Sequence, residues 1–160
     1  MTRGRSESGL TLMEILVVVA IASLMIGISF PAVTAGIDSL RISTACDSVV
    51  SFLNSGLTRA ERRQMVVEIS ILRNEQMVQM RSADASFVKE LTLPEGVTIQ
   101  RILPETLGAD ENAPRRFLIY PGGVMPRFGV ELVNRRGVHR IVRVDPISGV
   151  PLIERPEVQP

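Results

Sequence analysis

The hydrophobic and polar residues of this chain follow three successive patterns. Residues 15 to 33 carry no formal charge, and as a helix they would span roughly 28 Å, close to the hydrocarbon thickness of a bilayer. From residue 35 to 64 the apolar side chains recur every three or four positions, as on one face of a helix. They are Ile37, Leu40, Thr44, Ala45, Val49, Phe52, Leu53, Leu57 and Ala60. Because no turn signal separates the two patterns, they predict one helix of roughly 80 Å from Thr11 to Arg63.

The third pattern, after residue 64, alternates with a period of two and is divided by turns rich in Gly, Pro, Asn and Asp. It predicts short strands over residues 65–72, 76–81, 87–93, 97–103, 116–120, 129–133, 137–144 and 150–153. Pro121, Gly122 and Gly123 are interpreted as a hairpin turn, and Asp145 to Gly149 as a turn that the Asp caps. The expected fold class is α+β, with a long N-terminal helix packed through its second half on an antiparallel β-sheet.

The segment that precedes the apolar stretch is short and polar, and it carries Arg3 and Arg5. Because positive flanks stay cytoplasmic, we expect the N-terminus inside and the bulk of the chain exported. Three hypotheses then compete for the apolar stretch. It is a secretory signal peptide cut near Ala35, an uncleaved membrane anchor, or a helix that stays in the mature protein after cleavage behind Gly9.

The carboxylate at the start of the apolar stretch, Glu14, separates these hypotheses. A carboxylate there costs several kcal/mol unless it has a partner, and it gives a signal peptide no advantage. Thr11 and Glu14 fit the S/T-x-x-E capping box, which is a purely structural explanation. If the chain is cut behind Gly9, however, the free amine of Leu10 lies one helical turn from Glu14. The two charges can then pair, within one subunit or between neighbours.

The run of residues from Gly9 to Val18, GLTLMEILVV, resembles the class III signal of type IV pilins and pseudopilins. The resemblance implies that a prepilin peptidase cuts after Gly9 and methylates Leu10, a position where the family usually has Phe. It further implies that the helix resides in the inner membrane and then packs against other pilins in a helical filament. Glu14 and Thr11 would lie at that assembly contact.

Pro31 resembles another feature of the same family, a proline late in the apolar helix. Such a proline removes an N–H donor and its ring clashes with the preceding turn, so it would bend or locally melt the helix. The alternative is that Pro31 marks a helix end beyond the membrane.

The remainder of the chain is similar to the GspH/FimT family through residues 57–63, 117–123 and 141–149. Members are H-type minor pseudopilins of type II secretion systems and related minor pilins of type IV pili. The resemblance implies a structural subunit with a leader, a transmembrane and assembly helix, its amphipathic continuation, and a β-rich head in the periplasm or on a surface filament. These regions would be residues 1–9, 10–34, 35–64 and 65–160. Whether the filament serves secretion or a pilus stays open.

Composition and charge argue against several other function classes. The formal net charge of +1 provides no global field to recruit nucleic acid. Cys46 and His139 are the single residues of their types, so neither an intramolecular disulfide nor a Cys/His metal site is expected. No G-x-S-x-G, H-E-x-x-H, C-x-x-C or P-loop motif occurs. We therefore expect no enzyme activity, no metal and no cofactor.

The charges are nevertheless unevenly distributed. Residues 75 to 113 hold seven acids against three bases, which is net −4, and residues 115 to 160 hold eight arginines against four acids, which is net +4. Within the basic part, Arg135, Arg136, Arg140 and Arg143 could present guanidinium groups to the phosphates of nucleic acid. No aromatic residue is interleaved with them to stack on bases, and strand alternation separates Arg136 and Arg140 from Arg143. A solvated face or an interface with acidic partner subunits is the favoured interpretation. A DNA-binding minor pilin and a secreted β-domain with a cleaved signal are the alternatives.

Overall fold

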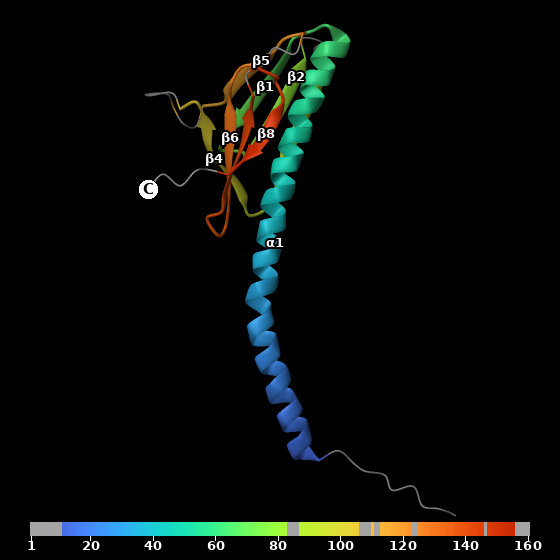
Figure 1. Cartoon of the computed structure of the whole chain (residues 1–160), viewed down its shortest axis with the longest axis vertical. Coiled ribbons are helices and arrows are strands. Elements are labelled where there is room, and N and C mark those ends of the chain that lie inside the picture. Colours follow the sequence, from blue (N-terminus) through green and yellow to red (C-terminus); the bar gives the residue numbers. More distant parts are fainter. Residues whose placement is uncertain are drawn as a thin grey trace, which may run out of the picture. The chain divides into compact units, whose positions relative to one another are not determined.

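The computed structural model describes residues 11–82, 87–105, 110, 113–122, 125–145 and 147–155, without the side chains of residues 31 and 32. Within these ranges the chain forms one helix and eight strands (Figure 1). In chain order they are α1 (Leu12–Arg63), β1 (Val67–Leu72), β2 (Met77–Ser82), β3 (Val88–Thr92), β4 (Val97–Leu103), β5 (Arg115–Ile119), β6 (Gly129–Asn134), β7 (His139–Val144) and β8 (Pro151–Glu154). The chain divides into two compact units, residues 1–37 and 38–160. The α+β class expected from the sequence is confirmed.

Helix α1 begins and ends at recognisable caps. At its N-terminus the hydroxyl of Thr11 accepts a hydrogen bond from the backbone N–H of Glu14 at 3.2 Å. At its C-terminus Gln64 adopts a positive φ of 51°, and the N–H of Met65 donates to the carbonyl of Ala60 at 3.3 Å. This is the Schellman arrangement, which satisfies a carbonyl that the helix leaves unpaired. The helix is therefore continuous over both patterns that the sequence distinguishes.

The face of α1 that packs into the head begins later than the sequence pattern predicts. The buried residues of this face are Ile42, Ala45, Cys46, Val49, Phe52, Leu53 and Ala60. Ile37 and Leu40 are 42% and 68% exposed, and Thr44 is exposed as well, so their assignment to this face was wrong. The error arises because Ile37 and Leu40 prolong the hydrophobic pattern of the preceding segment, whose side chains are exposed all round the helix. A 3.6-residue period does not by itself show which face of the helix is covered.

The strands form two antiparallel four-stranded sheets rather than the single sheet that we expected. Sheet A has the order β3-β2-β1-β5, and sheet B has the order β4-β6-β7-β8. Strand β5 returns to pair with β1, with Val67 opposite Ile119, while β4 pairs with β6. The connection that contains Gly122 consequently crosses from sheet A to sheet B. It is not the hairpin turn predicted from the sequence, although Gly122 does have the positive φ, 93°, that a turn glycine supplies.

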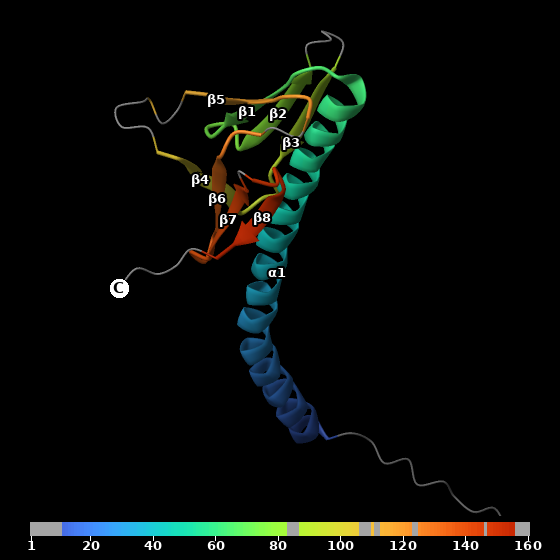
Figure 2. The same ribbon diagram turned by 45° about the horizontal axis from the view of Figure 1, so that its top comes forward.

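The core of the head is formed by both sheets and the second half of α1. In Figures 1 and 2 the last turns of α1, drawn in green, lie beside β2. Gly56 allows this close approach, because a Cβ at that position would lie 3.0 Å from Met80 Cε and 3.1 Å from Ile119 Cδ1. The two sheets meet at the rings of Phe117 and Phe128, which stack with centroids 4.2 Å apart. The head therefore has a core of its own, drawn from residues 42 to 144.

Candidate functional site

The first half of α1 carries large apolar side chains that nothing in its own unit covers. Leu16, Leu24, Ile28 and Phe30 are between 63% and 70% exposed, and the apolar residues between them are exposed as well. This helix is long and apolar enough to cross a membrane, and no residue in its most hydrophobic segment is buried. The hydroxyl of Ser23, a polar group within this segment, is satisfied locally, because it donates to the carbonyl of Val19 at 2.7 Å. Such a surface requires either lipid or another protein around it.

The two residues at the start of this helix have different tasks. The side chain of Thr11 caps the helix through the N–H of Glu14, which is one half of the expected capping box. The Glu14 side chain is exposed, and its carboxylate has no hydrogen-bond or ion-pair partner among the residues that the structure describes. The capping role thus belongs to Thr11, and the carboxylate of Glu14 is available to a group outside this part of the chain.

The remaining residues predicted for processing and assembly are placed only in part. Gly9 and Leu10 lie outside the described residues. The backbone of Pro31 lies inside α1, which continues for more than thirty residues to Arg63. The alternative that Pro31 ends the helix was therefore wrong. Because Pro31 has no N–H, the carbonyl of Gly27 lacks its helical donor at this point.

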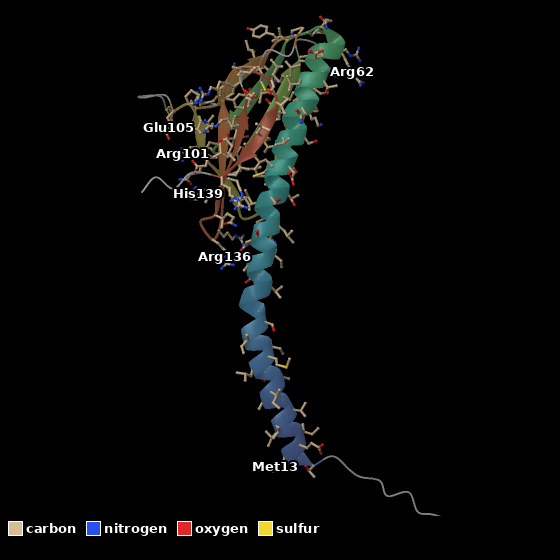
Figure 3. All side chains as sticks on the ribbon, in the orientation of Figure 1. Met13, Arg62, Arg101, Glu105, Arg136 and His139 are labelled. Carbon is tan, nitrogen blue, oxygen red and sulfur yellow. The ribbon has the colours of Figure 1, made fainter. Side chains whose placement is uncertain are left out.

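Two of the four arginines proposed for partner or nucleic-acid contact, Arg135 and Arg136, lie in the turn between β6 and β7. Figure 3 labels Arg136. The guanidinium of Arg135 forms an ion pair with the carboxylate of Glu95 in the turn between β3 and β4. Arg136 is exposed, and its backbone N–H donates to the side-chain oxygen of Asn134 at 3.0 Å. Within the described part of the chain its side chain has no acidic partner.

The other two arginines lie on β7 and point to opposite faces of sheet B. Arg140 donates through its guanidinium to the carbonyl of His139 at 3.0 Å. Arg143 lies on the same face as His139, and its Nε is 3.0 Å from the carboxylate of Glu154 on β8. The separation of Arg140 from Arg143 expected from strand alternation is confirmed. The structure does not bring the four guanidinium groups together into one phosphate-binding surface.

A cluster that the sequence did not reveal lies on the face of sheet B that carries His139. The carboxylate of Glu131, on β6, is only 2% exposed and receives hydrogen bonds from two neighbouring strands. Arg101 Nε on β4 lies 2.5 Å from one oxygen, and His139 Nδ1 on β7 lies 2.8 Å from the other. Arg101 also contacts Glu105 at 3.2 Å. Figure 3 shows Arg101, Glu105 and His139 on the side of the sheet away from α1.

The electrostatics of this cluster keep Glu131 ionised. Burial by itself raises the pKa of the carboxyl, but the hydrogen bonds from Arg101 and His139 and their charges outweigh it, so that the pKa of Glu131 is lowered. The same contacts raise the pKa of Arg101. Among the described residues no group of three metal-binding side chains is present. The cluster ties three neighbouring strands together, because Glu131 on β6 is bound by Arg101 on β4 and by His139 on β7.

A signal for this cluster was present in the sequence. Glu131 is a single acid inside the otherwise apolar stretch from Gly129 to Val133. Such a position requires a cationic partner when the strand is buried on both faces. The partner could not be identified, because Arg101 lies thirty residues away and the order of strands in the sheet brings it alongside.

Comparison with known proteins gives one informative result. No family model matches the chain, and neither does any curated protein. Among solved structures, the minor pseudopilin EpsH from the type 2 secretion system of Vibrio cholerae has a similar fold, with a TM-score of 0.55. The superposition covers 72% of this chain and 97% of the EpsH chain, at 14% sequence identity. The fold is thus that of a pseudopilin, which confirms the pilin-like architecture expected from the sequence.

Proposed function

We propose that this protein is a minor pilin or pseudopilin, a structural subunit of a type II secretion system or of a type IV pilus. Residues 10–34 hold it in the inner membrane, with the N-terminus in the cytoplasm and the head in the periplasm. Prepilin peptidase cuts after Gly9 and methylates Leu10, and the processed subunit enters a filament or its tip. The observation that carries the proposal is the exposed apolar half of α1, near whose start the carboxylate of Glu14 has no partner among the described residues.

The exposed apolar surface explains how one helix serves in two surroundings. In the membrane its side chains contact lipid tails. In a filament the same side chains contact copies of the same kind of helix, and apolar surface is not transferred to water in between. Pro31 lies within this helix, where a missing backbone hydrogen bond supplies a point at which the helix can bend during that transfer.

Glu14 gives the packing its register. In apolar surroundings a carboxylate without a partner is strongly destabilising, whereas one paired with an ammonium group is tolerated. The methylated amine of Leu10, in the same subunit or in a neighbour, is the partner that cleavage creates. A subunit that packs out of register leaves the carboxylate unpaired, so only one alignment of neighbouring helices is stable.

The local structure also favours this proposal over a cleaved signal peptide. Ala35, beside which a signal peptidase would cut, lies inside the continuous helix α1. Proteases act preferentially on exposed, irregular segments, so cleavage at Ala35 would first require the helix to open. Cleavage behind Gly9 keeps the helix whole.

The intact mass of the mature protein, isolated from bacterial membranes, tests the proposal. We expect a chain that begins at methylated Leu10. A chain that begins at Gly36 would identify a secreted β-domain and overturn the proposal. An unprocessed chain that begins at Met1 would identify a plain membrane anchor and overturn it as well.

A further inference from the structure

A groove with arginines at its rim lies in sheet B, at the end opposite to the turn between β6 and β7. It has a volume of about 460 Å³, within the range of pockets that bind small ligands or a few side chains. It is lined by Leu103, Pro104, Arg127, Phe128, Gly129 and Arg143. Of the four arginines that the sequence suggested for partner contact, Arg143 lines this groove, and Arg135, Arg136 and Arg140 do not.

The floor of the groove is apolar and held in place. Phe128 is 1% exposed and stacks on Phe117. Arg115 donates to the carbonyls of Ile102 and Pro104 at 3.0 and 2.6 Å, which fixes the end of β4 where the rim begins. The groove is therefore preformed, which lowers the entropic cost of binding.

The charge of the groove is unbalanced. The guanidinium of Arg143 is paired with Glu154, 3.0 Å away. Arg127 is exposed and has no hydrogen-bond or ion-pair partner within the described part of the chain. A ligand of this groove should therefore bring a negative charge to Arg127 and an aliphatic group to Leu103 and Pro104. Arg binds a carboxylate especially well, because two parallel N–H donors can meet both oxygens.

We propose that this groove binds an acidic segment of a neighbouring subunit, in which an Asp or Glu carboxylate contacts Arg127 beside an aliphatic side chain. Since the partner is taken to be a subunit of the same filament, this inference rests on the proposed function. Nucleic acid suits the groove less well. The buried ring of Phe128 cannot stack on a base, and no other described residue that lines the groove is aromatic.

Carbodiimide coupling in the full-length protein tests the contact directly. Arg127→Lys retains the positive charge and introduces an amine, which the reagent joins to a carboxylate in contact with it as an amide, with loss of water. The natural chain has one lysine, Lys89, so the new crosslink is readily assigned by mass spectrometry. Arg116→Lys is the matched control, because Arg116 lies on the exposed face of sheet A with its side chain 69% exposed.

In isolated filaments we expect the Arg127→Lys variant to be coupled to an Asp or Glu of another subunit, and the Arg116→Lys control not to be. Adding Leu103→Glu to Arg127→Lys should lower the yield about tenfold, the loss expected when a charge-assisted contact is opposed by a like charge. No intersubunit crosslink, a crosslink only to Glu154, or a yield that nuclease treatment abolishes would overturn the inference. If any of these three results is obtained while the subunit still enters filaments, the groove inference is wrong and the proposed function is retained. If the processed subunit does not enter filaments, both are overturned.

Discussion

The side-chain amide of Asn134 donates a hydrogen bond to the backbone carbonyl of Asp38 at 3.2 Å. The oxygen of the same amide accepts from the N–H groups of Arg136 and Val138, at 3.0 and 2.9 Å. Asn134 is 6% exposed. A single buried side chain therefore closes the turn between β6 and β7 and fastens that turn to the first residue of the head unit.

Replacement of Asn134 tests how much these hydrogen bonds stabilise the head. Asn134→Ala removes all three hydrogen bonds and leaves two N–H groups in the turn without their acceptor. We expect the free energy of unfolding of a fragment of residues 36–160, which contains the head unit, to fall by about 2 kcal/mol. Urea denaturation followed by circular dichroism measures it. Asn54→Ala, at an exposed position of α1, is the control, and an equal effect of both substitutions would contradict the role of Asn134.

The cluster around Glu131 predicts a specific dependence of stability on pH. The pKa of Glu131 is lower in the folded head than the ordinary value of about 4.3 expected when the chain is unfolded. The unfolded state therefore binds more protons in this range. The stabilisation is complete above about pH 4.3 and is lost as the pH falls through the lower, folded pKa.

Glu131→Gln should remove this dependence. At pH 7 we expect the variant to be about 2 kcal/mol less stable than the natural head, because a neutral amide replaces the buried carboxylate. The attraction to the charge of Arg101 is lost, and the amide has one accepting oxygen where the carboxylate has two. The difference should shrink as the pH is lowered below about 4. Urea unfolding at a series of pH values provides the measurement. Glu75→Gln, in an exposed turn, should follow the natural profile, and a Glu131→Gln head that also follows it would refute the assignment.

The contact between the two sheets should be equally measurable. Phe128→Ala removes a buried ring that stacks on Phe117, and we expect it to lower the free energy of unfolding by about 3 to 5 kcal/mol. Phe128→Leu retains most of the apolar volume and should cost less. In a double-mutant cycle with Phe117→Leu, a coupling energy of about 1 kcal/mol is expected for the stacked rings. A coupling energy near zero would show that the stacking itself contributes nothing.

Glu14 and Thr11 can be separated by substitution. Glu14→Ala should leave membrane insertion intact and strongly reduce the amount of subunit that copurifies with filaments, because the register of helix packing loses its charged pair. Thr11→Ala removes the helix cap, worth about 1 kcal/mol, but keeps the carboxylate, so it should have the smaller effect. Quantitative blotting of membrane and filament fractions measures both. Normal incorporation of the Glu14→Ala subunit would disprove the registering role.

The arginines of the basic part of the chain, residues 115 to 160, also permit a test of DNA binding. Arg135 and Arg143 are each paired with a carboxylate, and Arg140 lies on the other face of the sheet from Arg143. We therefore expect no retardation of DNA by the head, residues 36–160, in a gel shift, even at low ionic strength where phosphate contacts are strongest. A shift that disappears as salt is raised would instead favour a DNA-binding minor pilin.

Much of the local structure was predictable because it depends on neighbours in sequence. The period of two after residue 64, together with the turn residues between the segments, predicted all eight strands of the described head to within a few residues, because both signals are local in sequence. The turn at Asp145 was also predictable. Its carboxylate accepts from the N–H of Ile147 at 3.0 Å and from the hydroxyl of Ser148 at 2.7 Å, and these bonds lower the pKa of Asp145.

The arrangement of these elements was not predictable in the same way. Strand β5 could have paired with β4 or with β6, its neighbours along the chain, and it pairs instead with β1. The choice depends on which side chains fill the space between the sheets, as Phe117 and Phe128 do. The Glu131 cluster and the groove beside Arg127 both follow from this choice, and each joins residues far apart in the sequence.

The amino-acid sequence by itself therefore determined that a long apolar helix with a carboxylate near its start precedes a small α+β head. These properties depend on interactions over one or two helical turns and on the period of a strand. Only the tertiary structure decided that there are two sheets and not one, which face of α1 the head covers, and which charges are paired. Those are outcomes of packing between distant segments, where the burial of Ile42 rather than Leu40, or the pairing of Glu131 with Arg101, depends on the whole core.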